Sequence, residues 1–226
     1  MSVSLAAAAR HAPIAGLSPA LWSQPAAPEL QLAGTVLRSE ADRVLYVEGD
    51  EARCFYKVVS GAVRTCRHLS DGQRQIDGFY QPGDVFGIEA GAEHRLSAEA
   101  LTDCTVIAYR RRSLEAMMRD DNRLSQWFFT HVMTCMAQVR EHSLLWRHGS
   151  AAQKVAAFLL EMAERSESDR LVDLPMGRQD IADYLGLTVE TVCRTLSHMA
   201  KEGMITLPSS RRVVLQDRAT LQELNS

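Results

Sequence analysis

The segment GRQDIADYLGLTVETVCRTLSHMAKEGMITL, residues 177–207, decides the fold of the C-terminal part of this chain. Its apolar residues first recur at the spacing of one helix face. This first helix is predicted to end at Gly186, because glycine readily adopts the left-handed conformation that terminates helices. Its buried face is predicted to consist of Ile181, Ala182 and Leu185. A second helix is predicted to begin after Thr188, whose hydroxyl can cap it. Two helices joined by a tight glycine turn are typical of a helix-turn-helix.

The second helix of this pair is predicted to expose polar side chains near its N-terminus. Its inner face is expected to be formed by Val192, Leu196 and Met199, which follow helical spacing. The opposite face then carries Val189, Glu190, Cys193, Arg194 and Ser197. In a DNA major groove, Arg194 can donate two hydrogen bonds to guanine and Glu190 can accept one from cytosine. The other interpretation is that Glu190 and Arg194 form a surface ion pair one helical turn apart.

The predicted DNA interface extends beyond these two side chains. The segment MITLPSSRRVVLQD, residues 204–217, is predicted to form two strands around a turn at Pro208, Ser209 and Ser210, and a last helix is predicted to follow Asp217. Such a strand pair forms a wing that can lie against DNA phosphates. We expect base contacts from Val189, Glu190 and Arg194, and phosphate or supporting contacts from Thr188, Thr191, Ser197, Arg211 and Arg212.

Short β-type segments occupy the middle of the chain. RVLYVEG, CFYKVVSG and CTVIAYR lie between about residues 43 and 109, separated by turn signals such as Ser60-Gly61, Asp71-Gly72 and Pro82-Gly83-Asp84. Their regular spacing is typical of antiparallel strands that close into a barrel or a jelly roll. The sequence therefore predicts an α+β protein, with a flexible arm at residues 1–30 and an antiparallel β-barrel or jelly roll at residues 31–112.

Residues 113–147 contain neither glycine nor proline and are predicted to form one long helix. One apolar stripe consists of Phe129, Val132, Met136, Val139, Ser143 and Trp146, and a second of Leu124, Phe128, Cys135 and Leu145. One stripe can pack on the β-barrel. The other needs a second copy of the chain, so we expect a dimerisation helix and a homodimer. A helix buried within a single chain is the alternative. Residues 148–226 then form the winged helix-turn-helix.

The composition is that of an ordinary globular protein. Of the 226 residues, 46% are hydrophobic and 23% are charged, and the formal net charge is −3, so nucleic-acid contacts must come from a local patch. No apolar run is long enough to cross a bilayer, and the N-terminal stretch is a poor signal peptide. The cysteines, Cys54, Cys66, Cys104, Cys135 and Cys193, match neither a zinc site nor a disulfide framework. Free thiols fit a reducing cytosol, so we expect a cytoplasmic protein without a membrane partner.

The order of β-barrel, long helix and winged helix-turn-helix resembles the Crp-Fnr family of bacterial transcription regulators. PGDVFG, residues 82–87, is similar to the family's barrel motif, and LGLTVETVCRTLSHMAKEGMI, residues 185–205, is similar to its recognition helix. Within the family, GDVFGIEAGAEHRLSAEA and LPMGRQDIADYLGLTVETVCR are similar to the FixK-type branch.

This resemblance implies a DNA-binding transcription activator that is not an enzyme and that works with RNA polymerase. The FixK-type branch governs genes for low-oxygen respiration, nitrogen fixation and nitrogen metabolism. The resemblance also implies that Glu190 and Arg194 read a TTGA half-site in an inverted repeat of double-stranded DNA, which agrees with the base chemistry of the two side chains.

Departures from the family pattern bear on cofactors. Cyclic-AMP binders in the family have a glutamate after the barrel glycine and an arginine followed by serine or threonine. Here Ile88 follows Gly87, and Leu96 follows Arg95. Fnr-type iron-sulfur proteins have clustered N-terminal cysteines, whereas no cysteine precedes Cys54 here. We therefore expect no required cofactor and no metal.

Two other functions stay open at this stage. Haem-binding relatives need an axial ligand, which His68, His94 or His131 could supply, so the alternative is a regulator of the same fold gated by haem, a gas or another small molecule. A cupin-type enzyme would need metal-binding histidines at close spacing on adjacent strands, whereas His68 and His94 stand alone.

Cys193 is a further departure, because the family more often has serine there. An exposed thiol near a helix N-terminus and an arginine is favoured for oxidation. Its position between Glu190 and Arg194 predicts that oxidation weakens DNA binding. The alternative is that Cys193 is a passive replacement for serine.

Overall fold

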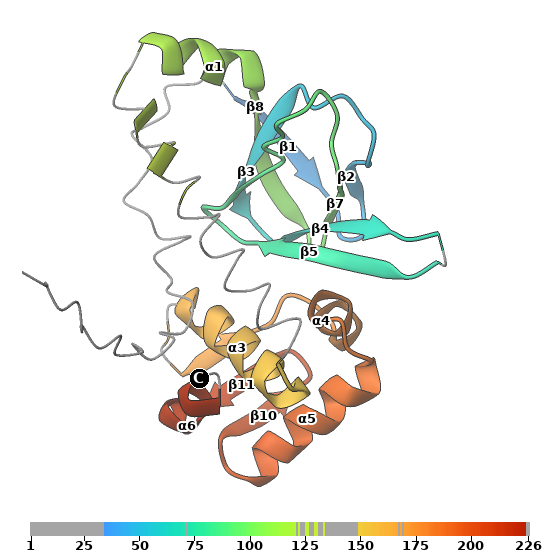
Figure 1. Cartoon of the computed structure of the whole chain (residues 1–226), viewed down its shortest axis with the longest axis vertical. Coiled ribbons are helices and arrows are strands. Elements are labelled where there is room, and N and C mark those ends of the chain that lie inside the picture. The colour runs from blue at the N-terminus through green and yellow to red at the C-terminus, as the bar shows by residue number, and fades with distance from the viewer. Residues whose placement is uncertain are drawn as a thin grey trace, which may run out of the picture.

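The computed structural model describes residues 34–70, 72–120, 149–166, 168 and 170–224, together with residues 122, 125, 126, 129, 130 and 133. Within these residues, strands come first and helices dominate the C-terminal part (Figure 1). No helix in this part of the chain is both long enough and apolar enough to span a bilayer.

Residues 35–110, called the β region below, form two four-stranded antiparallel sheets. The strands are β1 Thr35–Ser39, β2 Val44–Tyr46, β3 Cys54–Ser60, β4 Val63–His68, β5 Arg74–Tyr80, β6 Val85–Phe86, β7 Ser97–Ala100 and β8 Cys104–Arg110. One sheet has the order β1-β8-β3-β6 and the other β2-β7-β4-β5. Both contribute to a core of Tyr46, Val58, Val63, Phe86, Ala98, Ala100, Cys104 and Val106. The predicted antiparallel β fold is confirmed, as a jelly-roll-like pair of sheets rather than a closed barrel.

The β region begins earlier than the β-type sequence pattern, which starts at about residue 43. Strand β1 is exposed over most of its length, so its sequence lacks the alternation that marks a half-buried strand. It forms because it adds to the edge of β8, with Thr35 opposite Ala108 and Ser39 opposite Cys104. Pairing with a distant strand therefore decides its structure.

The helix predicted from residue 113 begins slightly earlier, as α1, Arg111–Asp120. Farther along, Phe129 and Met133 are helical and are 66% and 50% exposed. Phe129 belongs to the first predicted apolar stripe, whereas Met133 was assigned to neither, and the other members of both stripes lie outside the described residues. Dimerisation through this helix stays a prediction.

Residues 151–224, called the C-terminal region below, combine four helices with a small sheet in the part that the structure describes. The elements are α3 Ala151–Glu164, β9 Leu171–Asp173, α4 Arg178–Leu185, α5 Val189–Lys201, β10 Ile205–Ser209, β11 Arg212–Leu215 and α6 Arg218–Leu224. The sheet has the order β10-β11-β9. Helix α3 begins in a capping box, in which Ser150 accepts from the Gln153 amide and the Gln153 side chain accepts from the Ser150 amide. As predicted, Asp217 caps the last helix by accepting a hydrogen bond from the Thr220 amide.

The wing differs from the sequence prediction in the position of its turn. Pro208 and Ser209 belong to β10, and the turn is formed by Ser210 and Arg211. The pairing of β10 with β11 shifts register between Thr206 and Ser209. Because proline has no amide hydrogen to donate, it is tolerated at such an irregularity in a strand. The turn is therefore tighter than the composition of the loop indicated.

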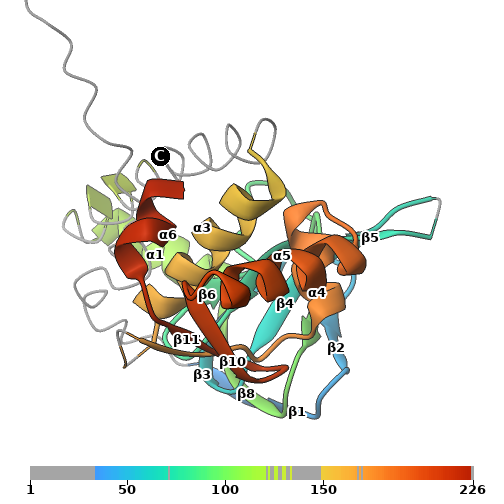
Figure 2. The same ribbon diagram turned by 90° about the horizontal axis from the view of Figure 1, so that it is seen from below.

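The β region and the C-terminal region share one hydrophobic core. From the β region it contains Ala62, Cys66, Ile76, Phe79 and Leu101, which pack with buried residues of α3 to α6. The Phe79 ring on β5 lies 6.3 Å from Phe158 on α3 and 5.1 Å from Tyr184 on α4, measured between ring centroids. Figures 1 and 2 show α3 and α4 beside the sheet that contains β4 and β5. The two parts are thus packed together.

Candidate DNA-binding interface

The turn between α4 and α5 has the predicted geometry. Gly186 ends α4 in the left-handed conformation, with φ 64° and ψ 39°, and its amide donates to the Ala182 carbonyl. Ile181, Ala182 and Leu185 are buried, as predicted. At the other end of α4, the Asp180 carboxylate accepts a hydrogen bond from the Gly177 amide at 3.0 Å, which satisfies an otherwise unpaired donor.

Helix α5 is capped and packed as the sequence predicts. The Thr188 hydroxyl oxygen accepts a hydrogen bond from the Thr191 amide at 3.2 Å and lies 2.9 Å from the Thr191 hydroxyl oxygen. Val192, Leu196 and Met199 are at most 2% exposed. These contacts fix which face of α5 points away from the core.

The exposed face of α5 carries Glu190, Cys193, Arg194 and Ser197. Within the described part of the chain, no ion pair joins Glu190 to Arg194, so the competing interpretation of these two residues finds no support in the structure. Val189 differs from the other predicted base-contact residues, because it is half-buried and packs against the core. Only part of its side chain is available to a ligand.

The two wing arginines are exposed but have partners within the protein. Arg211 donates from Nη1 to the Pro175 carbonyl at 3.0 Å. Arg212 Nε lies 2.7 Å from Asp173 Oδ1, and both side chains of this ion pair are more than half exposed. Exposed ion pairs contribute little, so a phosphate can compete for Arg212. Neither partner could be predicted from the sequence, because Pro175 lies 36 positions before Arg211 and Asp173 lies 39 positions before Arg212.

Arg178, the first residue of α4, is a candidate functional residue that the sequence analysis missed. Its guanidinium is partly buried, and one of its nitrogens, Nη1, is buried without a hydrogen-bond partner. Burial lowers the pKa of Arg178, and the nearby Cys193 opposes that shift. An arginine at a helix N-terminus is unfavourable with respect to the helix dipole, and this was the available signal. Arg178 therefore adds positive charge beside the exposed face of α5.

In the β region, aromatic rings surround the glycine of the PGDVFG motif. A Cβ added to Gly87, which has φ +74°, would lie 3.1 Å from Tyr56, 3.2 Å from Tyr46 and 3.4 Å from His94. The His94 ring stacks on Tyr46 with 3.7 Å between centroids, and Tyr56 stacks on Phe86. The protein's own side chains therefore occupy the space next to this glycine.

The candidate haem ligands are placed differently from one another. His94 is 3% exposed, and its Nδ1 atom has no hydrogen-bond partner and lies 3.8 Å from Glu89. Burial lowers the pKa of His94, whereas Glu89 opposes the shift. His68 is exposed on β4, and His131 lies outside the described residues.

Cys66, His68 and Glu99 have potential metal-ligand atoms within 4.8 Å of one another. Glu99 is already paired with Arg64, with 2.6 Å between Nη2 and Oε2. Burial and Glu99 raise the pKa of Cys66 to about 11, which keeps its thiol protonated. Because Glu99 is held by Arg64, one of the three potential ligands is already engaged within the protein.

Comparison with known proteins identifies the family. Residues 153–224 match the Crp-like helix-turn-helix domain, and residues 36–121 match the cyclic nucleotide-binding domain. Over 185 residues, the chain is 44% identical to the nitrogen fixation regulation protein FixK of Azorhizobium caulinodans, covering 79% of this chain and 75% of that protein. The FixK of Rhizobium meliloti is 39% identical over 80% of this chain and 83% of its own length. The structure of FixK2 from Bradyrhizobium japonicum superposes with a TM-score of 0.82 at 40% identity, covering 86% of this chain and 98% of that one.

The fold and the helix-turn-helix thus define a DNA-binding transcription regulator. The chain belongs to the Crp-Fnr family, in its FixK-type branch. The resemblance that rested on the PGDVFG and recognition-helix motifs is confirmed. The individual site residues stay predictions, because none of these comparisons tests them.

Proposed function

We propose that this protein is a homodimeric transcription activator that binds a TTGA-type inverted repeat in double-stranded DNA and recruits RNA polymerase. Its targets are genes of low-oxygen respiration or nitrogen fixation. Two FixK relatives carry the name of nitrogen fixation regulators, and a relative from Rhodopseudomonas palustris, 34% identical, is named a transcriptional activatory protein. In this proposal the protein acts in the cytoplasm and catalyses no reaction.

The observation that carries the proposal is that Glu190 and Arg194 are both exposed on α5 and have no ion-pair partner among the residues that the structure describes. Both are near the helix N-terminus, which is the part of a recognition helix that approaches base edges in the major groove. Arg194 suits guanine and Glu190 suits cytosine, so one G·C pair of each half-site can be read by both side chains. Thr188, Thr191, Ser197, Arg211 and Arg212 are proposed to support this contact, and Arg178 joins them.

Homodimerisation is supported by the exposure of Phe129 and Met133. Large apolar side chains in a helix that follows the β region gain stability when a second copy covers them. Two copies related by a two-fold axis would present two α5 helices to an inverted repeat. The proposed domain boundaries are residues 31–112, 113–147 and 148–226, with residues 1–30 as an arm.

Independence from a cofactor is supported by the aromatic rings around Gly87. Tyr46, Tyr56 and His94 occupy the position where a nucleotide would have to approach that glycine. The alternative, a regulator gated by a small ligand, is favoured by one observation. The buried Nδ1 atom of His94 lies 3.8 Å from Glu89, too far for a hydrogen bond, and a small polar ligand could supply one.

One binding experiment tests the operator and the cofactor together. Purified protein without added ligand should bind an inverted TTGA repeat more tightly than a scrambled duplex, and cyclic AMP should not change the affinity. Genome-wide mapping of bound DNA should return the same motif upstream of respiratory or nitrogen-fixation genes. Binding that appears only after haem, a gas or a nucleotide is added would establish the ligand-gated alternative.

A further inference from the structure

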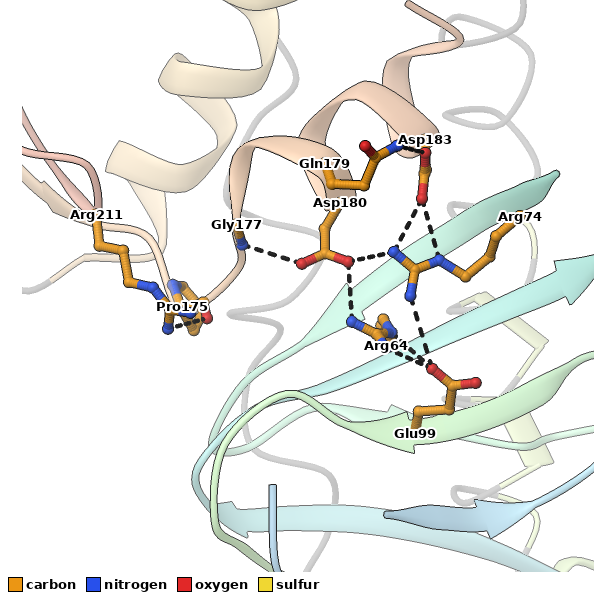
Figure 3. Close-up of polar contacts among 9 residues, drawn as sticks. All are labelled: Arg64, Arg74, Glu99, Pro175, Gly177, Gln179, Asp180, Asp183 and Arg211. Atoms are coloured by element: carbon orange, nitrogen blue, oxygen red, sulfur yellow. Dashed lines mark hydrogen bonds and ion pairs between the residues drawn. The ribbon is translucent and has the colours of Figure 1, made fainter. Parts of the chain in front are cut away.

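Two arginines of the β region hold α4 through its two aspartates. Arg64 Nη1 on β4 lies 2.8 Å from Asp180 Oδ1, and Arg74 Nη2 on β5 lies 2.6 Å from the same oxygen. Arg74 Nη2 is also 2.9 Å from Asp183 Oδ2. Figure 3 shows both guanidiniums pointing from the sheet toward α4, with Glu99 of β7 beneath them. We call Arg64, Arg74, Asp180 and Asp183 the α4 clamp.

The α4 clamp is shielded from water. Each of its four side chains is at most 20% exposed, unlike the surface pair between Arg53 and Glu51, where both side chains are more than 60% exposed. Salt screens buried charge pairs much less than exposed ones. Removing one partner of a buried pair is also costly, because the remaining charge is left without compensation. The clamp therefore favours one arrangement of α4 on the sheet.

A second set of contacts fixes the other end of α4. Phe79 on β5 packs on Tyr184 in the last turn of α4, with 5.1 Å between ring centroids. Arg165, which follows α3, donates from Nη1 to the Phe79 carbonyl at 3.0 Å and forms an ion pair with Asp84 of the β region. Helix α4 is thus attached to the sheet at both its first and its last turn.

Because α5 packs on α4, the position of α4 on the sheet also determines the position of α5. The two helices are joined by the three residues Gly186, Leu187 and Thr188. They share the buried residues Ile181, Leu185 and Val192 in one core. A displacement of α4 on the sheet would therefore move Glu190 and Arg194 as well. The contacts run without interruption from β4 and β5 through α4 to the exposed face of α5.

We propose that the α4 clamp sets the spacing between half-sites that this regulator accepts, by holding each recognition helix at a fixed position on its own β region. This inference rests on the proposed function, since it requires a dimer that reads an inverted repeat. If each C-terminal region moved freely, binding the second half-site would cost additional ordering entropy, and inverted repeats of several spacings would bind similarly. A fixed position removes that cost for one spacing and penalises the others.

The experiment measures discrimination between spacings. Full-length protein is titrated with synthetic inverted repeats whose central spacer varies in steps of one base pair, and with a duplex that carries a single half-site. The variants are Arg74→Gln and the milder Arg74→Lys. Asp180 is left intact because it also caps α4. The matched control is Arg53→Gln, which breaks the exposed pair with Glu51.

We expect wild type and Arg53→Gln to prefer one spacer strongly. Arg74→Gln should lose at least about tenfold in affinity for that spacer, within the range of about 10²- to 10⁴-fold that linked binding can supply, and should bind the others more evenly. Its affinity for a single half-site should not change. Thermal unfolding identifies any variant that does not fold, and Arg74→Lys then replaces Arg74→Gln.

Two results would overturn the inference. These are an unchanged spacer preference in a folded Arg74 variant, and an equal loss of single-site and inverted-repeat affinity. Failure of the proposed function looks different, because wild type itself would then be monomeric or would not distinguish the TTGA repeat from scrambled DNA.

Discussion

Glu161 on α3 accepts a hydrogen bond from the hydroxyl of Tyr184 on α4, with 3.4 Å between the two oxygen atoms. Burial raises the pKa of Glu161 to about 7, although Arg165 and the hydrogen bond from Tyr184 oppose the shift and the negative charge of Asp84 adds to it. Glu164, on the same helix, also has its pKa raised to about 7 by burial, against the opposing charge of Arg218. Both carboxyl groups lie where α3 packs on its neighbours.

These carboxyl groups predict how stability depends on pH. A carboxyl group whose pKa is higher in the folded than in the unfolded protein binds more protons when folded, so the free energy of unfolding falls as pH rises between the two values. We expect stability to decrease from about pH 4.5 to about pH 7 by roughly 1 kcal/mol or more, since one pKa unit corresponds to about 1.4 kcal/mol. Chemical denaturation at a series of pH values measures this. Glu161→Gln should flatten the dependence, whereas the control Glu115→Gln, at an exposed position, should not. A wild-type stability that rises over this range would contradict the assignment.

Arg194 is predicted to determine sequence preference. Arg194→Ala should weaken operator binding by about 1–3 kcal/mol and relax discrimination at one guanine of each half-site, because two hydrogen bonds to that base are lost. Binding titrations on the operator and on duplexes altered at single positions measure both effects. An unchanged ratio of specific to scrambled affinity would show that α5 does not read this base through Arg194.

The wing arginines should behave differently from Arg194. Removing Arg211 or Arg212 should weaken binding to all sequences alike and reduce the steepness of the salt dependence by about one phosphate contact. Because Asp173 occupies Arg212, Asp173→Asn should strengthen binding without changing the preferred motif. A change of motif in any of these three variants would contradict a phosphate-contacting wing.

The apolar side chains beyond α1 predict a dimer. Light scattering at micromolar concentration should give twice the chain mass. Phe129→Glu should shift the protein toward monomers and weaken operator binding, because a charge would be buried in the interface. Leu69→Glu, at another exposed apolar position, is the matched control and should remain dimeric. A monomeric wild type that still binds the operator specifically would refute this prediction.

The sequence predicted the helix-turn-helix well, because its determinants are local. Gly186, the Thr188 cap and the Val192 stripe each act within one or two helical turns, so periodicity and capping rules apply directly. Pro208 misled the prediction of the wing turn. Proline and serine usually favour turns, but a register shift between paired strands accommodates this proline within β10.

The contacts between the β region and α4 could not be predicted in the same way. Arg64 and Asp180 are 116 positions apart, and in sequence each resembles an ordinary surface charge. Likewise, the sequence around Arg212 gives no sign of an acidic partner, whereas in the structure Asp173 forms an ion pair with it. Such pairs depend on how distant elements pack, and one sequence carries no local signal for that.

Cys193 leads to the last prediction, that oxidation weakens DNA binding. The structure places it as a free and exposed thiol on the same face of α5 as Glu190 and Arg194. The three other described cysteines, Cys54, Cys66 and Cys104, are partly or fully buried. Among these four cysteines, peroxide should therefore reach Cys193 first, since oxidation follows exposure of the thiol. Successive oxidation to sulfenic, sulfinic and sulfonic acid enlarges the side chain and then adds negative charge, which would repel phosphates and crowd Arg194.

The test compares peroxide-treated wild type with Cys193→Ser in an operator-binding titration. Serine has nearly the same shape but does not follow this oxidation series, so the variant should keep its affinity after treatment while wild type loses at least about tenfold, the effect of about 1.4 kcal/mol. Mass spectrometry of the treated protein should locate the added oxygen on Cys193. Reducing agent should restore wild type only while the product is sulfenic acid, because the higher acids are not reversed by thiols. Equal loss in both proteins would mean that another cysteine or a methionine carries the sensitivity, and that Cys193 only replaces serine on this face.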